Sequence, residues 1–357
     1  MSKGRVVVAM SGGVDSTVCA CLMQEQGHEV IGVTLQLYDY GEATCSTKPS
    51  KTCCASKDIF DAQNACDKLG IKHYVLNYED IFREEVIQEF ADQYIAGYTP
   101  IPCVKCNQTV KFRDLFKIAK KLGAEKLITG HYVQKKNGKF GVEMYQGLDS
   151  VKDQSYFLFQ TTKEQLEFLD FPLGGNTKEQ TRELARKYGL EISEKPDSQN
   201  ICFVPDGDYA KVVQKFHPNS GKEGNIVDVK TGKVLGVHHG IIHYTIGQRR
   251  GLGIGGGSPL YVCKLDAQTN TVFVGGYENL LRYTFSIQKP HFLLSENETL
   301  PKNITVRVRS SCQAVACNIN GDIVTLEEKI SFIAPGQAAV FYHNKRMIGG
   351  GYIEKIF

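Results

Sequence analysis

Short apolar runs rich in β-branched residues alternate with helix-like segments through the first half of the chain. The strand-like runs cover residues 5–10, 30–37, 73–76 and 126–129. The helical patterns cover 14–26, 56–69, 81–97, 110–122 and 177–188. Strands separated by helices must be joined by crossovers, so we expect an α/β domain with a doubly wound parallel sheet and helices on both faces.

The texture of the sequence changes after about residue 205. Short alternating runs follow at 224–230, 240–245, 260–265 and 271–274, separated by Gly-rich turns. From about residue 283 the pattern stays strand-like, with turns at Asn320-Gly321-Asp322 and His343-Asn344-Lys345. We therefore expect three domains: the α/β domain over 1–205, a small β-rich central domain over 206–282, and a C-terminal antiparallel β-barrel over 283–357.

Composition sets the broad class. With 42% hydrophobic and 23% charged residues, the chain is typical of soluble globular proteins. The net charge of +3 does not by itself indicate a nucleic-acid binder, so any basic surface must come from local clusters. No apolar run reaches the ~18 residues of a membrane span, and the run 6–10 is too short for a signal peptide. We expect a cytoplasmic protein without a membrane partner.

The first strand-like run ends in the glycine-rich segment Met10-Ser11-Gly12-Gly13-Val14-Asp15-Ser16, which opens a helix. Backbone N–H groups at such a turn converge on an anion, together with the positive end of the helix. A carboxylate at Asp15 would repel phosphates unless Mg²⁺ lay between them. The pattern is not a Walker A loop, and a tight turn with a capping Asp is the alternative.

This segment resembles the pyrophosphatase loop of enzymes that cleave ATP to AMP and pyrophosphate and transfer the AMP onto a carbonyl oxygen. The motif occurs in argininosuccinate, GMP and asparagine synthetases and in tRNA thiolases. The cysteines have to decide among them.

Three of the twelve cysteines stand where sulfur chemistry is favoured. Cys103 and Cys106 form a C-x2-C between two helical patterns, and Cys202 follows a polar stretch at 195–200. We expect Cys106 to lie just before the helix at 110, where the helix dipole and nearby lysines would lower the pKa of its thiol. Structural zinc is disfavoured because no second intact C-x2-C completes a site.

The whole chain resembles the tRNA-specific 2-thiouridylase family. The motifs that carry this resemblance are the loop at 10–16, TPIPCVKCN at 99–107, TGHY at 129–132, KDQSYFL at 152–158, DSQNICF at 197–203, YTIGQRRGLG at 244–253 and PGQ at 335–337. The resemblance implies an ATP-pyrophosphatase fold of the adenine nucleotide alpha hydrolase-like type. It also implies ATP-dependent 2-thiolation of the wobble uridine at position 34 of tRNA, with Mg²⁺ as cofactor.

The resemblance also implies roles for single residues. Cys202 would carry sulfur as a persulfide, and Cys106 would attack it and leave a Cys106–Cys202 disulfide; direct attack of the persulfide on the base is the alternative. The implied ATP contacts are Ala9, Met10, Ser11, Gly12, Gly13, Val14, Asp15, Ser16, Leu35 and Gly130. The implied tRNA contacts are Ile101, Pro102, Cys103, His131, Lys152, Asp153, Gln154, Arg309, Ser310 and Gln337.

Other chemistries remain open. Some family members carry Asp at the position of Cys103, so a thiol there puts that residue's acid–base role in doubt. Cys103, Cys106 and Cys202 could instead ligate a 4Fe–4S cluster. We favour the persulfide route because Cys106 is expected nearer the helix start and because the family tolerates a carboxylate at the Cys103 position. An adenylating amide ligase and a non-catalytic RNA-binding or iron–sulfur sensor protein are further alternatives.

The expected partners are tRNA, through the Lys, Glu and Gln tRNAs that the family acts on, and a persulfide-delivering carrier or cysteine desulfurase. The segment 105–126 carries seven basic residues against two acidic ones, and we expect it to follow tRNA phosphates. The insert from Cys45 to Cys54 has no assigned role, and a solvent-exposed loop is the default.

Overall fold

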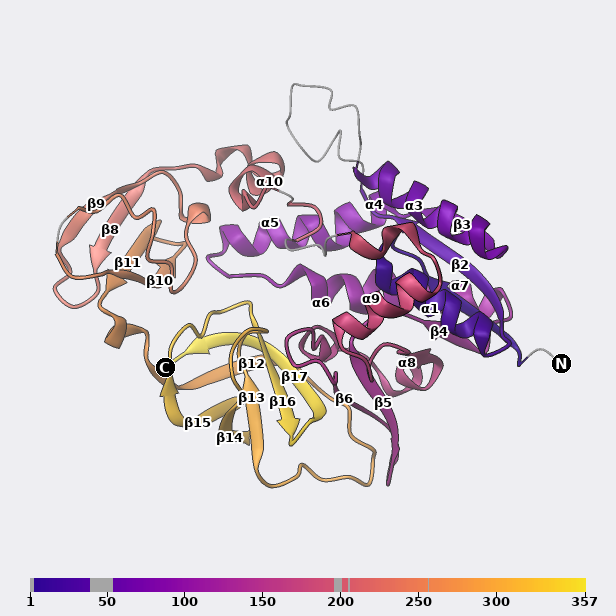
Figure 1. Ribbon diagram of the computed structural model, residues 1–357. Coiled ribbons are helices and arrows are strands. Elements are labelled where there is room, and N and C mark those ends of the chain that lie inside the picture. The colour runs from indigo at the N-terminus through magenta and orange to yellow at the C-terminus, as the bar shows by residue number, and fades with distance from the viewer. Residues whose placement is uncertain (1–2, 39–53, 196–200, 205, 256) are drawn as a thin grey trace.

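The computed structural model describes residues 3–38, 54–195, 201–204, 206–255 and 257–357 (Figure 1). Most of the Cys45–Cys54 insert and the polar stretch at 196–200 lie outside the described residues. The chain forms an α/β part, a small central β part and a C-terminal barrel, arranged side by side. Within the described residues, no helix has the length and apolar character that crossing a membrane requires.

The expected parallel sheet is confirmed, and it has five strands in the order β3-β2-β1-β4-β7. The strands are β1 (Arg5–Ala9), β2 (Glu29–Gln36), β3 (Lys72–Asn77), β4 (Lys126–Ile128) and β7 (Leu169–Asp170). All four neighbouring pairs run parallel. Side chains of β1 alternate between the two faces, with Val7 in one buried cluster and Val6 and Val8 in the other. Burial on both faces explains why this strand is an unbroken apolar run.

Helices cover both faces. One face packs against α1 (Val14–Glu25), α3 (Cys54–Leu69) and α9 (Lys178–Lys187). The other face packs against one long helix, which runs from α6 (Pro102–Cys106) through a π-helical stretch, η2 (Asn107–Leu115), into α7 (Phe116–Lys121). The remaining helices of this part are α4 (Glu79–Phe82), η1 (Arg83–Ile87), α5 (Gln88–Ile95), η3 (Ser155–Leu158), α8 (Lys163–Phe168) and η4 (Glu191–Glu194).

The start of the long helix differs from the expectation. The sequence pattern predicts a helix from residue 110, but the structure starts it eight residues earlier, at Pro102. Proline is favoured at the first position of a helix because its missing N–H would have no partner there. The Ile101-Pro102 step is therefore the beginning of the helix and not part of a loop.

The C-terminal barrel is confirmed as an antiparallel, closed structure. Its strands are β12 (Arg282–Phe292), β13 (Ile304–Arg307), β14 (Val315–Asn320), β15 (Ile323–Ile330), β16 (Ala338–His343) and β17 (Arg346–Ile356). They follow the order β12-β15-β14-β13-β16-β17, and pairing of β12 with β17 closes the ring. Both predicted turns lie between paired strands, and Gly321 and Asn344 take the positive φ angles that such turns need.

A hairpin of the α/β part continues the barrel sheet. Strands β5 (Val133–Gly138) and β6 (Gly141–Gln146), which the sequence pattern did not predict, pair with each other. β6 also pairs with β17, where Arg346 lies opposite Tyr145 and Met347 opposite Met144. The first and last parts of the chain therefore share one eight-stranded sheet.

The central part holds a four-stranded sheet in the order β10-β11-β8-β9. Its elements are α10 (Tyr209–Phe216), η5 (Pro218–Ser220), β8 (Gly224–Asp228), β9 (Val234–His238), η6 (Ile241–His243), β10 (Tyr261–Asp266), β11 (Thr271–Gly275) and η7 (Tyr277–Leu280). The predicted strand at 240–245 is wrong. Gly240 has φ +125°, and adjacent Ile241 and Ile242 are both buried in a short 3-10 turn, which an alternating strand does not allow.

Candidate active site

The glycine-rich loop joins β1 to α1 at the carboxyl edge of the parallel sheet. Gly12 has φ +70°, and a Cβ there would lie 2.1 Å from the carbonyl oxygen of Asp58, so glycine is required. The Ser16 hydroxyl accepts from the Ser11 N–H at 3.2 Å and donates to the Gly13 carbonyl at 3.1 Å. No side chain caps the N-terminus of α1 at Gly13. The loop is thus tightly closed around backbone N–H groups suited to an anion.

The expected ATP contacts differ in how buried they are and in which of their atoms can reach a ligand. Met10 and Val14 are buried in the apolar cluster beside α1, so only their backbone atoms can face a ligand. A Cβ on Gly130 would lie 3.0 Å from the Asp15 Cβ and 3.2 Å from the Ser16 nitrogen. The absence of a side chain at Gly130 therefore lets this residue pack closely against the glycine-rich loop. Leu35 is half-buried at the carboxyl end of β2, on the same sheet edge as Ala9.

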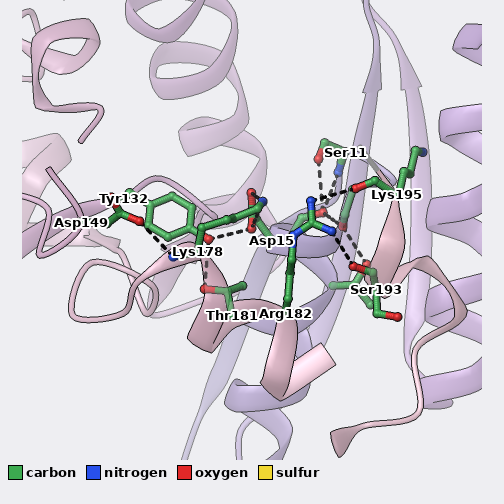
Figure 2. A network of polar contacts seen from close by, with 12 residues as sticks. Ser11, Asp15, Tyr132, Asp149, Lys178, Thr181, Arg182, Ser193 and Lys195 are labelled. Atoms are coloured by element: carbon green, nitrogen blue, oxygen red, sulfur yellow. Dashed lines mark hydrogen bonds and ion pairs between the residues drawn. The ribbon is translucent and has the colours of Figure 1, made fainter. Parts of the chain in front are cut away.

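Asp15 is held by two side chains that the sequence did not single out (Figure 2). The Lys178 Nζ donates to both carboxylate oxygens, at 2.8 and 2.9 Å. The Tyr132 hydroxyl donates to Oδ1 at 2.9 Å and also lies 2.9 Å from the Thr181 hydroxyl. Both partners come from segments far along the chain, so only the fold could reveal them.

A second lysine fixes the loop from another side. The Lys195 Nζ donates to the Gly12 carbonyl at 2.9 Å and forms ion pairs with Asp58 at 2.8 Å and Asp61 at 2.6 Å. Both carboxylates belong to α3. Lys195 thereby ties the glycine-rich loop to the neighbouring helix α3.

The cysteine helix places the thiols differently from the expectation. Since the helix begins at Pro102, Cys103 lies in the first turn and is exposed, whereas Cys106 lies in the second turn and is 7% exposed. Burial raises the pKa of the Cys106 thiol, against the lowering effect of Lys111. The expectations that Cys106 precedes the helix and has a low thiol pKa are therefore wrong, and Cys103 is the thiol nearer the helix start.

Cys202 directly precedes, in the chain, two residues of the apolar cluster that contains Cys106. Its neighbours Phe203 and Val204 are buried in that cluster, and Leu35 packs against it from the end of β2. The Cys202 thiol is exposed, although protein surrounds it. Burial by this surrounding protein, together with the nearby Cys106 and Cys103 thiols, raises the pKa of Cys202 to about 12, although Lys111 and a hydrogen bond with Tyr38 act in the opposite direction.

All three thiols are thus electrostatic neighbours, and none of the three is in a disulfide. Lys111 influences each of them as well as His131. Among the described residues, no three His, Cys, Asp or Glu side chains converge as a metal site requires. The three thiols as they lie do not fit a cluster site.

The implied tRNA contacts near the thiols are the short run 101–103 at the start of the cysteine helix and, separately, His131. Ile101 is half-buried and Pro102 is buried, which leaves Cys103 as the exposed residue of this short run. Burial lowers the pKa of His131 to about 3, with Lys111 acting in the same direction, and its Nδ1 lies 2.9 Å from the Thr129 hydroxyl. A neutral imidazole suits a base or ribose better than a phosphate.

Most of the other implied tRNA contacts bond within the protein. Asp153 is buried and pairs with Arg307 at 2.7 Å, and the Gln154 side chain accepts the Tyr132 N–H. Arg309 donates to the carbonyls of Phe332 and Ile246, and Gln337 donates to the Thr99 carbonyl at 2.9 Å. The Ser310 carbonyl accepts from Arg307, and Lys152 is half-buried. Asp153 and Gln337 thus each bond between the α/β part and the barrel.

The basic segment is partly neutralised. Lys105 pairs with Glu89, Arg113 with Glu85 and Asp114, and Lys120 with Glu164. Lys117 and Lys121 are exposed on α7. A phosphate track along this helix would therefore rest on fewer charges than the sequence count indicates.

Comparison with known proteins agrees with this architecture. Residues 4–206 match the family model described as tRNA methyl transferase HUP domain, and 210–276 match the tRNA methyl transferase PRC-barrel domain. Residues 282–353 match the aminomethyltransferase beta-barrel domain. The tRNA-specific 2-thiouridylase MnmA of Rickettsia massiliae is 54% identical over 99% of this chain and 97% of its own. The chain belongs to the tRNA-specific 2-thiouridylase family.

A second member of the 2-thiouridylase family, from Rickettsia bellii strain OSU 85-389, is 53% identical over 99% of this chain and 97% of its own. Likeness to solved structures is weak. A 4-thiouridine synthetase–RNA complex with bound ATP has a TM-score of 0.39 and 19% identity, covering 60% of this chain and 54% of that one. The NMN synthetase of Francisella tularensis has a TM-score of 0.35 and 17% identity, covering 60% and 76%.

Proposed function

We propose that this protein replaces the C2 oxygen of the wobble uridine in tRNA by sulfur, at the expense of ATP. The observation that carries the proposal is that Cys202 lies within electrostatic reach of Cys106. The apolar cluster that contains Cys106 and Phe203 also packs against Leu35, at the end of β2 on the sheet edge that bears the glycine-rich loop. The relatives named 2-thiouridylases support it. ATP chemistry and a sulfur nucleophile are the two things that such a reaction needs at one place.

The first step activates the uridine. Backbone N–H groups of the loop 10–16 bind the phosphates of ATP, and the C2 oxygen attacks the α-phosphorus and expels pyrophosphate. Mg²⁺, when bound, would neutralise the phosphates and would be held by Asp15, whose carboxylate is of the type this ion prefers. The uridine must leave its stack for this attack, since C2 is unreachable inside it.

The second step transfers sulfur. A carrier or cysteine desulfurase leaves a terminal sulfur on Cys202 as a persulfide. The Cys106 thiolate attacks the Cys202 Sγ, the S–S bond of the persulfide breaks, and hydrosulfide leaves with its electron pair. Hydrosulfide then attacks C2 and expels AMP. The Cys106–Cys202 disulfide that remains is reduced by an external thiol before the next turnover.

Burial of the thiols limits how much reactive thiolate is available for this step. Because burial raises the pKa of both Cys106 and Cys202, most of each thiol is protonated at neutral pH. A persulfide is more acidic than a thiol, and Lys111 is the cation whose charge favours the anionic forms here. Unloaded thiols stay unreactive, which protects the pair from oxidation.

The proposal extends to cellular context. The protein would act in the cytoplasm on the Lys, Glu and Gln tRNAs. Its assembly with tRNA would place the barrel domain against the tRNA backbone, while the α/β domain holds the extruded base.

Mass spectrometry of tRNA tests the function directly. Purified protein is incubated with the tRNA, ATP, Mg²⁺ and a persulfide source, and nucleosides are analysed for 2-thiouridine. The wild type and a Cys312→Ser control are expected to thiolate, whereas Cys106→Ser and Cys202→Ser are not. Methylated uridine without sulfur would contradict the proposal and favour the activity in the family model's description. Absence of 2-thiouridine with the wild type, together with ATP-dependent pyrophosphate release that both cysteine variants retain, would favour an amide ligase.

The same assay separates the two sulfur chemistries. The persulfide route predicts activity in aerobically purified, iron-free protein and less damage from Cys103→Ala than from Cys106→Ala. Activity that appears only after anaerobic iron–sulfur reconstitution, with Cys103→Ala as damaging as Cys106→Ala, would overturn it.

A further inference from the structure

Lys178 occupies the carboxylate that the proposed reaction needs for Mg²⁺. Its Nζ contacts both oxygens of Asp15, and its side chain is 12% exposed against 32% for Asp15. Two oxygens at hydrogen-bond distance from one ammonium leave little room for a cation on the same side (Figure 2). A divalent cation can bind Asp15 closely only when Lys178 moves.

The backbone of Lys178 is fixed, whereas its side chain can move. Its N–H donates to Asp149 at 3.0 Å, and Thr177 and Gln180 form a capping box around the start of α9. Four methylene groups separate this anchored backbone from the ammonium. The amine can therefore change partners without any change in the helix.

Tyr132 is built to tolerate such a change. Its hydroxyl lies 2.9 Å from both Asp15 and the Thr181 hydroxyl, so it keeps a hydrogen-bond partner when Asp15 turns to a cation. The Lys178 Nζ lies 5.8 Å from the centroid of the Tyr132 ring, which lines the side of the site. Lys195, by contrast, is committed to Asp58, Asp61 and the Gly12 carbonyl and is not placed to follow the phosphates.

We infer that Lys178 is a phosphate-binding residue with two positions. It neutralises Asp15 before ATP binds, and it moves to the phosphate oxygens when a divalent cation takes its place on the carboxylate. The inference rests on the proposed function only in taking ATP as the ligand of the loop. It deepens that function by naming the group that stays with the pyrophosphate as it leaves.

The exchange keeps the charge around Asp15 balanced. Without ATP, one ammonium faces one carboxylate. With ATP, Asp15 would hold a divalent cation that neutralises the phosphates, and the released ammonium would add a positive charge where negative charge develops on the leaving pyrophosphate. Lys178 thus competes with the metal for Asp15 and cooperates with it on the phosphates. A purely structural ion pair would do neither.

Two binding measurements on the whole protein, without tRNA or a sulfur source, test whether Lys178 weakens metal binding but strengthens pyrophosphate binding. Manganese(II) is titrated without nucleotide by electron paramagnetic resonance, and inorganic pyrophosphate with Mg²⁺ by calorimetry. In Lys178→Met we expect manganese to bind about 10-fold more tightly, because the competing ammonium is gone. Pyrophosphate is expected to bind about 10- to 100-fold more weakly, the loss of one hydrogen bond between charged groups.

Three variants control the result. Lys187→Met, on the same helix in an exposed pair with Glu25, should change neither affinity. Lys178→Met combined with Asp15→Asn should lose the gain in manganese affinity. Lys178→Gln keeps polar contacts to Asp15 and Tyr132 without the charge, and it gives the same two measurements if the Met variant does not fold.

Manganese and pyrophosphate affinities that both fall, or that both stay unchanged in folded protein, would overturn the inference. Neither measurement involves sulfur transfer or tRNA. Failure of the thiolation assay with both binding results as expected would therefore count against the proposed function alone. Thiolation by wild-type protein with unchanged binding in Lys178→Met would count against the inference alone.

Discussion

Burial and one nearby charge act in opposite directions on the pKa of the reactive thiols. Three cysteines lie together with protein packed around them, and burial holds the pKa of each above its ordinary value. Lys111 acts against burial at all three, from the π-helical stretch one turn after Cys106. Burial therefore raises the pKa of all three thiols, and Lys111 is a charge that acts against this rise at each of them.

Replacing Lys111 should make the thiols slower to react. In Lys111→Met the pKa of Cys103, Cys106 and Cys202 rises further, so the thiolate fraction below the pKa falls. Alkylation of the exposed Cys103 and Cys202 near pH 8 should slow by about threefold or more, the effect of half a pKa unit. Mass spectrometry of iodoacetamide-treated protein over a pH series measures this. Lys117→Met, an exposed lysine on the same helix, should leave the rates unchanged, and equal slowing in both variants would contradict the role of Lys111.

Among the elements, those with clear periodicity were predictable and those joined by tertiary contacts were not. The buried run 6–8 could only be a central strand, and Thr177 with Gln180 marks the start of α9. The cysteine helix was placed too late because two prolines were interpreted as a loop, although Pro102 is itself a start signal. The β5–β6 hairpin lacked a clear signal, because its two turn residues, Lys139 and Phe140, are not the Asn-Gly or Asp-Gly pair typical of such turns.

The turn at 335–337 controls the segment that leads into the cysteine helix. The Thr99 N–H donates to the Pro335 carbonyl at 2.7 Å, and Gln337 donates back to the Thr99 carbonyl. Gly336 has φ +88°, and a Cβ there would lie 3.0 Å from the Thr99 oxygen. A barrel turn and the thiol-bearing helix are therefore directly coupled.

Gly336→Ala should disturb this coupling. The positive φ costs about 1 kcal/mol of stability in any such position, and contact with the Thr99 carbonyl adds to it. Gly321→Ala is the matched control, because Gly321 has φ +62° with open space around it. Thermal unfolding should show the larger loss for Gly336→Ala, together with a changed alkylation rate at Cys103. Equal losses and unchanged alkylation would mean that the turn does not affect the helix.

The exposed lysines of α7 should carry whatever phosphate contacts this helix makes. Lys117→Ala with Lys121→Ala should weaken tRNA binding and reduce its dependence on salt by up to ~0.7–0.9 log units per lost phosphate contact. Lys105→Ala should change the slope less, since that lysine already pairs with Glu89. Binding titrations over a salt series measure both. If the salt dependence of tRNA binding in the double variant equals that of the wild type, these lysines do not contact phosphates and are ordinary solvent-exposed residues.

Across the whole molecule, a few buried ion pairs hold the α/β part to the barrel. Asp153 and Arg307 pair with side chains 2% and 11% exposed, and Arg346 contacts both Glu143 and Glu298. The family resemblance pointed to the residues of the site. A motif does not show, however, which of these residues form bonds with other parts of the protein. Asp153 and Gln337 show this, as do Lys178 and Lys195, whose reach to the loop depends on packing between distant segments.

Removing one partner of the buried pair should be costly. Arg307→Met leaves the Asp153 carboxylate buried without its ion pair, a change that typically costs about 3–5 kcal/mol in the free energy of unfolding. The guanidinium also loses its position 5.9 Å from the ring centroids of Tyr156 and Tyr342. Lys230→Met, which breaks an exposed pair with Glu278, should hardly change stability. Denaturant unfolding distinguishes the two, and similar losses would show that the buried pair contributes little.

The sheet shared by β6 and β17 bears on how the chain folds as it is made. Residues 141–146 leave the ribosome well before their partner strand at 346–356, which lies much later in the chain. Until then β6 presents an open edge, the kind of surface that pairs wrongly with other chains. The edge of β6 is thus covered only once β17 has been synthesised, and a chain cut short before β17 would keep an aggregation-prone edge.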